Sequence, residues 1–354
     1  MINKLKGRDF ALLSEEESSP KGKIYPLQKG KTYVNPFPPD ENPPRSLLTT
    51  SFASWGVKTR PEQVLPIIAL QPNIALPDTL NGLYISWLGH SSCMLQIQGV
   101  KILIDPLVTN NISPVPGVRI RRYQEQSPLI IDDVSEIDLV FISHNHYDHL
   151  DKKAIQALKT KVSLFVVPRG VKRTLCQWGV PEDKIKEFSW WEEDEISTPS
   201  GFFLKFACTP ARHCSGRGPF SINQSLWVSW VIRSPQYKVF YSGDTSYSFH
   251  FRQIGELYGP FDLSLIECGQ YNEAWSENHL FPEETVQAHL DIQGVFLLPV
   301  HWGSFTIAQH SWWEPITRAI QYAREKGVKI ITPRIGETIQ LGEIVSEEWW
   351  VRYH

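Results

Sequence analysis

Short apolar runs alternate with amphipathic segments along most of the chain, from about residue 83 onward. Apolar runs bounded by glycine-containing turns predict strands, whereas apolar residues that recur every three or four positions predict helices. The predicted strands cover residues 83–88, 93–97, 101–104, 163–167, 233–244 and 262–267, and the predicted helices cover residues 249–258, 282–290 and 313–326, with another beginning near Lys152. This alternation predicts an α/β fold in which outer helices cover the sheets.

The first eighty residues depart from this pattern. Prolines are frequent there, so the segment is expected to be extended and poor in regular structure. Two apolar stretches, residues 46–55 and 63–70, have no strand-like partner nearby, so they either pack on the main fold or contact lipid. The residues concerned are Leu47, Leu48, Phe52, Trp55, Leu65, Ile67 and Ile68. We therefore divide the chain into an N-terminal extension, residues 1–80, that wraps the core or contacts lipid, and a main domain, residues 81–354.

The composition fits one large folded unit without a nucleic-acid partner. With 354 residues, of which 42% are hydrophobic, the chain can bury a sizeable core. Its net charge of -3, from 35 basic and 38 acidic residues, provides no basic field that would attract nucleic acid. The five cysteines lack C-x-x-C spacing and indicate reduced thiols, and the N-terminal residues do not resemble a secretory signal. A cytoplasmic location is therefore expected.

A cluster of three histidines and one aspartate follows the apolar run of residues 137–143. It consists of His144, His146, Asp148 and His149, in the pattern H-x-H-x-D-H. Imidazole nitrogen and carboxylate oxygen are good zinc ligands, and a tight loop after a strand can fold such side chains around a metal ion. The alternatives are a solvated polar loop or histidines satisfied inside a core, but four potential ligands at this spacing favour a metal site.

Three further residues occupy comparable positions later in the chain. His213, Asp244 and His301 are each the first candidate ligand after an apolar run, so they are expected to project from the same edge of a sheet. Each alone has an ordinary structural explanation, but together they complete the set of ligands that two metal ions need. Asp105, which precedes Pro106, is expected either to orient one of the histidines or to cap a turn.

The cluster and the three later residues resemble the ligand pattern of the metallo-β-lactamase superfamily. The resemblance implies an αββα sandwich that holds two zinc ions. It implies that His144, His146 and His213 hold one ion, that Asp148, His149 and His301 hold the other, and that Asp244 bridges the pair. Two divalent ions about 3.5 to 4 Å apart can share a water, lower its pKa and so direct a bridging hydroxide at phosphorus or a carbonyl carbon.

Other segments are similar to a narrower family, the N-acyl-phosphatidylethanolamine-hydrolysing phospholipases D. They are residues 33–38, 87–90, 142–151, 190–193, 243–245, 258–263, 282–284 and 301–303. This resemblance implies a zinc phosphodiesterase that releases N-acylethanolamine and leaves phosphatidic acid. It implies catalytic roles for Asp148 and His279, and substrate contacts by Tyr147, Asn278 and His279. Asn278 departs from the glutamine of the mammalian members, so headgroup recognition is expected to differ, and packing against the metal loop is the alternative role for Tyr147.

The resemblance also implies partners. They are a phospholipid substrate and a membrane surface that the protein binds peripherally, with a homodimer as one option for assembly. Two alternatives remain for the function: a metallo-hydrolase of another small phosphodiester or of a lactone, and a non-catalytic lipid-binding protein with a relic metal site. The complete set of seven predicted ligands argues against the second alternative, because a binding module has no need to keep every ligand.

Overall fold

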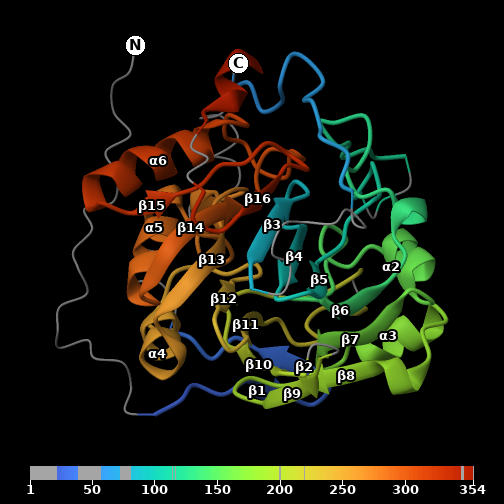
Figure 1. Ribbon diagram of the computed structural model, residues 1–354. Helices are drawn as coiled ribbons and strands as arrows, with labels where there is room; N and C mark the ends of the chain where they lie inside the picture. The colour runs from blue at the N-terminus through green and yellow to red at the C-terminus, as the bar shows by residue number, and fades with distance from the viewer. Residues whose placement is uncertain are drawn as a thin grey trace.

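Two seven-stranded sheets stack face to face in the computed structural model, and helices cover both outer sides (Figure 1). The structure describes residues 22–38, 57–71, 81–113, 115, 117–198, 201–218, 220–343 and 347–353. The predicted αββα sandwich is confirmed by this arrangement.

The two sheets have a similar design. The first has the strand order β16-β3-β4-β5-β6-β7-β8, and the second has the order β15-β14-β13-β12-β11-β10-β9. In each sheet, three neighbouring pairings are antiparallel and the other three are parallel. The strands of the first sheet are β3 Leu83–Trp87, β4 Cys93–Ile97, β5 Val100–Ile104, β6 Ile137–Phe141, β7 Val162–Pro168, β8 Ile185–Phe188 and β16 Thr338–Gln340. Those of the second are β9 Glu193–Ser197, β10 Phe203–Thr209, β11 Ser229–Arg233, β12 Lys238–Tyr241, β13 Phe261–Glu267, β14 Gly294–Val300 and β15 Lys329–Ile330.

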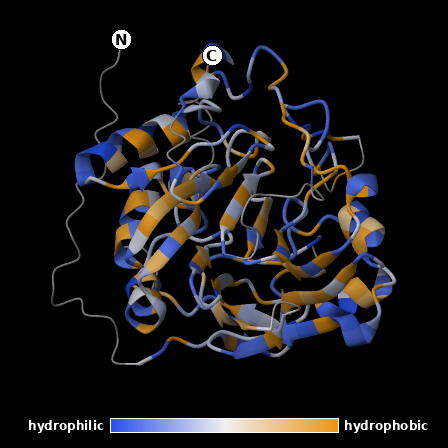
Figure 2. Ribbon diagram, viewed as in Figure 1, coloured by the Kyte–Doolittle hydropathy of each residue, from blue (hydrophilic) through white to orange (hydrophobic). Residues whose placement is uncertain are grey.

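Side chains of the first sheet alternate between two apolar layers. In β6, Leu139 and Phe141 belong to the core between the sheets, whereas Val140 belongs to a second apolar cluster that includes Ile155 and Leu175 of the outer helices. Because successive strand residues point to opposite faces, a strand with apolar residues at nearly every position fits only where both faces are covered. Figure 2 shows the hydrophobic residues concentrated along the strands of both sheets.

Five α-helices are described, and they divide between the two outer faces (Figure 1). Helices α2 Lys152–Leu158 and α3 Lys172–Gln177 lie on the first sheet, and α4 His250–Tyr258, α5 Pro282–Asp291 and α6 Glu314–Lys326 lie on the second. Short 3-10 turns are η1 Ile131–Asp133, η2 Glu182–Lys184, η3 Glu273–Trp275 and η4 Trp349–Tyr353. The helices predicted over residues 249–258, 282–290 and 313–326 agree with α4, α5 and α6 to within one residue at each end.

The strand predicted over residues 233–244 is wrong, because β11 ends and β12 begins within this stretch. The two strands pair antiparallel, and the turn between them is closed by a hydrogen bond of 2.9 Å from the Ser234 amide to the Tyr237 carbonyl. Pro235 lies at the second position of this turn and has no amide hydrogen to contribute to a sheet.

Described parts of the first eighty residues pack on the sandwich. Strands β1 Leu27–Lys29 and β2 Thr32–Val34 form a short hairpin, and the Phe37 ring lies 5.5 Å from that of Phe249 between ring centroids. Leu65 is buried in the core between the sheets, so packing rather than lipid contact is its role, and Ile67 packs against the same core. Leu47, Leu48, Phe52 and Trp55 lie outside the described residues. Within the ranges that the structure describes, no helix is long and apolar enough to cross a membrane.

Candidate metal centre

The predicted ligands converge from both sheets at one end of the sandwich. His144, His146, Asp148 and His149 lie in the loop that follows β6 of the first sheet, referred to below as the metal loop, residues 142–150. His213, Asp244 and His301 follow β10, β12 and β14 of the second sheet. Strands β10 and β12 both pair antiparallel with β11, and β14 is parallel to β12 through β13, so all three strands end on the same edge, as expected. The metal loop faces that edge from the other sheet.

Asp244 lies between two groups of potential ligands. Its Oδ2 lies 3.8 Å from His144 Nε2 and 3.7 Å from His213 Nε2, while its Oδ1 lies 3.1 Å from His149 Nε2 and 3.2 Å from His301 Nδ1. The ligand atoms form one group of His144, His146, His213 and Asp244, another of His90, Asp148, His149 and His301, and a third, overlapping group of Asp244, Glu267, His279 and His301, with all atoms of a group within 4.8 Å of one another. The first two groups together contain all seven predicted ligands, and Asp244 lies between them.

Buried polar atoms without a partner show that these groups fit metal ions. Among the described residues, His149 Nε2, His301 Nε2 and Asp244 Oδ1 are buried and make no hydrogen bond. Leaving such atoms unpaired in a protein interior is costly. His149 Nε2 and Asp244 Oδ1 lie 3.1 Å apart and contact only other groups of the centre, so a metal ion would supply them and His301 Nε2 with a partner. Imidazole and carboxylate donors in sets of four match the coordination of borderline divalent ions. The two groups fit a binuclear metal centre.

Burial and neighbouring charge set the protonation states of the donors. Burial lowers the pKa of His144, His213 and His301 well below the ordinary value, so these imidazoles are neutral and keep a lone pair. Burial alone would raise the pKa of Asp148 and Asp244, but the neighbouring His149 outweighs it and holds both carboxyl groups well below their usual range. Neutral imidazoles and ionised carboxylates are the forms that bind metal. Burial would lower the pKa of His149, but the Asp244 and Asp148 carboxylates outweigh it and raise that pKa well above the ordinary value, so His149 has to lose a proton to bind metal.

His90 was missed as a ligand candidate from the sequence. It follows β3, is fully buried, and its Nε2 lies 2.9 Å from Asp148 Oδ2. Its ring also lies 4.1 Å from that of His301 between centroids. A histidine directly after a predicted strand was the available signal, the same one that identified His213 and His301. His90 either orients Asp148 or supplies a fourth donor to that group.

Asp105 orients a histidine of the metal loop, as predicted. Its Oδ2 accepts hydrogen bonds from His149 Nδ1 at 2.7 Å and from the Tyr241 hydroxyl at 2.6 Å. The Ser143 amide donates to Oδ1 at 2.8 Å and the Ser143 hydroxyl donates to Oδ2 at 2.5 Å. These bonds fix the His149 ring with Nε2 directed at the Asp244 side of the centre.

Asp105→Asn should weaken metal binding about 10- to 100-fold, because the amide nitrogen of Asn cannot accept the hydrogen bonds that this carboxylate receives. Competition with a chelator of known affinity measures the change. Asp138→Asn is the matched control, since Asp138 accepts the Lys101 amide at 2.7 Å at the start of β6, away from the centre. Unchanged metal affinity in the Asp105 variant would contradict the orienting role.

A buried glutamate holds His279 beside the metal groups. Glu267, the last residue of β13, is fully buried, and its Oε2 accepts from His279 Nδ1 at 2.7 Å. Its Oε1 accepts from the Thr245 amide at 2.6 Å. The His279 ring stacks on His301 at 5.2 Å between centroids. Burial opposes protonation of His279, but the Glu267 carboxylate outweighs it and raises the pKa of His279 to about 9, so the pair holds a proton at neutral pH.

Asn278 and Tyr147, the other two predicted substrate contacts, both lie close to the metal groups. The Asn278 backbone carbonyl accepts from His213 Nδ1 at 2.8 Å, so Asn278 contributes to the centre through its main chain. The Tyr147 hydroxyl donates to the Arg217 carbonyl at 3.0 Å, and the Arg217 guanidinium lies 3.9 Å from the centre of the Tyr147 ring. Tyr147 therefore packs at the outer side of the metal loop, and its contact with substrate stays a prediction.

Comparison with known proteins places this geometry in a family. Residues 101–302 match the model of the beta-lactamase superfamily domain, so the chain belongs to the β-lactamase superfamily and is a metal-dependent hydrolase of that class. An uncharacterized protein of Mycobacterium tuberculosis is 39% identical over 297 residues, covering 82% of this chain and 77% of that protein. The N-acyl-phosphatidylethanolamine-hydrolyzing phospholipase D 1 of Caenorhabditis elegans is 29% identical over 347 residues, covering 88% of this chain and 93% of that protein.

Solved structures show the same fold at low sequence identity. A metallo hydrolase of the archaeon Ignicoccus hospitalis is 22% identical with a TM-score of 0.57, covering 73% of this chain and 97% of that chain. The isothiocyanate hydrolase from Delia radicum gut bacteria is 19% identical with a TM-score of 0.56, covering 72% of this chain and 98% of that chain. The resemblance to these structures supports the fold alone.

Proposed function

We propose that the protein is a zinc-dependent phosphodiesterase of the phospholipase D type, which hydrolyses N-acyl-phosphatidylethanolamine to N-acylethanolamine and phosphatidic acid. One observation carries the proposal. Asp244 lies between two groups of potential metal ligands, and next to them lies His279, which is hydrogen-bonded to the buried Glu267. The substrate class is supported by the similarity to the Caenorhabditis elegans phospholipase D along most of both chains.

Seven side chains would hold the two ions. His144, His146 and His213 would hold one, Asp148, His149 and His301 the other, and Asp244 would contribute one oxygen to each. Zinc suits these donors because it accepts imidazole nitrogen and carboxylate oxygen without a strong preference for geometry. When bound, the two ions supply Lewis-acid stabilisation of the phosphate and activate the attacking water.

Asp148 and His279 divide the proton transfers in this proposal. The water oxygen forms a bond to phosphorus, the bond from phosphorus to the ethanolamine oxygen breaks, and the leaving oxygen needs a proton. His279 supplies it from Nε2, since Nδ1 is occupied by Glu267. Asp148 accepts the proton of the water; its side chain is 13% exposed, whereas that of Asp244 is 2% exposed, so Asp148 is the more accessible carboxylate.

The lipid chains favour reaction at a membrane surface. Each methylene moved from hydrocarbon to water costs about 0.8 kcal/mol, so extracting a diacyl substrate completely would be very unfavourable. A protein that meets the headgroup at the surface and leaves the chains in the bilayer avoids this cost. Peripheral binding is therefore part of the proposal.

Incubation of the zinc-loaded protein with a panel of vesicle phospholipids tests the proposed reaction. We expect N-acylethanolamine and phosphatidic acid from N-acyl-phosphatidylethanolamine, and about tenfold or greater discrimination against phosphatidylcholine, whose headgroup lacks the amide. In water enriched in oxygen-18, the label should enter the phosphate of phosphatidic acid, because the attack is at phosphorus.

Two outcomes would contradict the proposal. Label in the N-acylethanolamine would place the attack at carbon. Hydrolysis of lactones without turnover of any phospholipid would favour the lactone alternative.

A further inference from the structure

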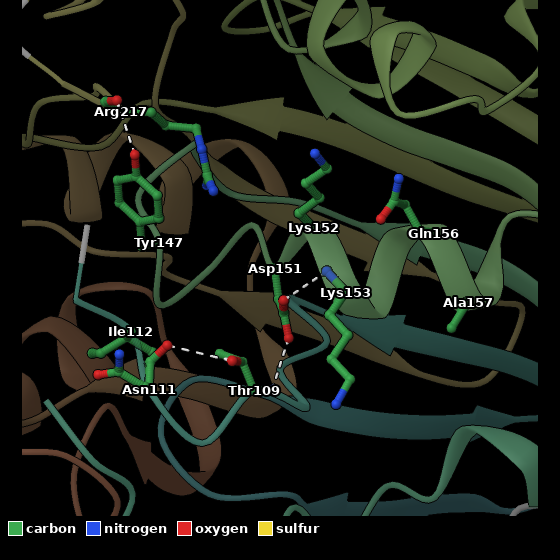
Figure 3. Close-up of a pocket in the computed structure, with 10 residues that line it drawn as sticks. All are labelled: Thr109, Asn111, Ile112, Tyr147, Asp151, Lys152, Lys153, Gln156, Ala157 and Arg217. Atoms are coloured by element: carbon green, nitrogen blue, oxygen red, sulfur yellow. Dashed lines mark hydrogen bonds between the residues drawn. The ribbon is translucent and has the colours of Figure 1, made fainter. Parts of the chain in front are cut away.

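A groove lies on the outer side of the metal loop, between the start of α2 and the segment that follows β5. It has a volume of about 630 Å³, and its lining includes Tyr147, Arg217, Lys152 and Lys153 (Figure 3). Tyr147 stands between the predicted ligands His146 and Asp148 in the chain. The groove is therefore next to the metal loop but is not part of either ligand group.

The groove carries a local positive charge. Lys152 and Lys153 are exposed, and no carboxylate of the described residues lies within 4.0 Å of either ammonium group. Asp151 also lines the groove, but its Oδ2 accepts the amides of Val108 at 2.9 Å and Thr109 at 2.8 Å, and its Oδ1 accepts the amide of Lys153. Three cationic side chains thus face one carboxylate that is already hydrogen-bonded, in a chain whose net charge is -3. An anion fits this groove better than a cation.

Arg217 gives the groove a fixed donor. Its Nη1 donates to the carbonyls of Leu150 at 2.7 Å, Asn145 at 3.1 Å and His146 at 3.4 Å, and its guanidinium lies over the rings of Tyr147 and Trp178. Within the described residues, Nε and Nη2 have no acceptor. The Arg217 guanidinium is therefore fixed in orientation, and its Nε and Nη2 donors remain available. Such a group is suited to a phosphate, which accepts paired N–H donors.

We propose that this groove binds a phosphate-bearing anion at a site distinct from the metal centre, with Arg217 as the directional donor and Lys152 and Lys153 as flanking charges. The anion is a soluble phosphate monoester or the headgroup of an anionic lipid. Arg217 would then contact the anion on one side and the metal-loop carbonyls on the other. The inference stands on the groove itself and holds whether or not the chain hydrolyses phospholipids.

Lysine footprinting of the metal-loaded protein tests the site directly. The rate of acetylation at each lysine is measured by mass spectrometry with no addition, with glycerol 3-phosphate, with phosphatidylcholine vesicles, and with vesicles that also contain phosphatidic acid. We expect acetylation of Lys152 and Lys153 to slow about threefold or more with a phosphate-bearing addition, and that of Lys326 and Lys329, which are exposed elsewhere, to stay unchanged. Because the readout is specific to each lysine, it reports on the groove rather than on the total phosphate that the protein binds.

A double variant adds a measurement of affinity. Because this variant lacks both reporter lysines, binding is measured by equilibrium dialysis of glycerol 3-phosphate and by vesicle co-sedimentation. Lys152→Ala with Lys153→Ala should weaken binding of the protective anion about tenfold or more, whereas Lys326→Ala with Lys329→Ala should not change it. Protection by glycerol 3-phosphate assigns the site to soluble phosphate esters, and protection only by vesicles with phosphatidic acid assigns it to lipid headgroups. Equal protection by phosphatidylcholine vesicles, equal protection of the control lysines, or no protection would overturn the proposal.

Discussion

Replacement of Asp244 by Asn should lower turnover by about a thousandfold or more in the metal-supplied protein. Asp244 presents one carboxylate oxygen to each of the two ligand groups, at 3.7 Å from His213 Nε2 and 3.1 Å from His149 Nε2. An amide replaces one of these oxygens by an NH2 group, which cannot coordinate a cation, so one ion of the pair should be lost or bound loosely. Metal content per chain and turnover are measured on the same preparation.

Asp262→Asn is the matched control for this variant. Asp262 also belongs to the second sheet, and its Oδ2 accepts the Lys238 amide at 2.8 Å, far along the strands from the metal groups. The control should keep its metal and its activity, and both variants should keep the near-ultraviolet circular dichroism of the parent. Near-full activity in Asp244→Asn protein that holds its full metal content would rule out the bridging role.

The sequence was sufficient to predict most of the fold because burial imposes a simple pattern on it. Strands covered on both faces, such as β6 and β7, are apolar at nearly every position, and α4, α5 and α6 show helical spacing. The strand predicted over residues 233–244 begins at the last residue of β11 and includes the turn at Pro235, so β11, Ser229–Arg233, was not predicted as a separate strand. Strands β8 and β9 contain several charged residues and carry a weaker apolar signal.

The sequence was sufficient to predict metal ligands that directly follow strands. It was less informative about residues whose hydrogen-bond partners are distant in the chain. Glu267 ends a buried strand, and only the folded structure brings its carboxylate to His279 and the Thr245 amide. Asn278 accepts the hydrogen bond of His213 Nδ1 through its backbone carbonyl, and no side-chain pattern can predict such a bond. Arg217 is seventy-one residues from His146 in the chain, yet its guanidinium binds the metal-loop carbonyls. These contacts depend on the tertiary structure rather than on spacing.

The His279 variant should separate proton donation from metal binding. His279→Ala should lower hydrolysis of N-acyl-phosphatidylethanolamine about 100- to 10,000-fold, because the departing alkoxide is a poor leaving group that needs a proton. A diester with a p-nitrophenyl leaving group needs little protonation, so its hydrolysis should fall about tenfold or less. Metal content should stay unchanged, since the seven predicted ligands do not include His279. A parallel loss of metal would instead make His279 structural.

Glu267→Gln extends this test to the residue that positions His279. The amide oxygen can still accept from either Thr245 or His279, but the carboxylate that receives both bonds is lost, so His279 should be held less firmly. We expect a loss of about 10- to 100-fold with the alkoxide leaving group and little loss with the p-nitrophenyl one. In the His279→Ala background, Glu267→Gln should have almost no further effect, because the two residues act as a unit. Equal losses with both leaving groups, or additive losses in the double variant, would show that Glu267 supports the fold of the site and does not act through His279.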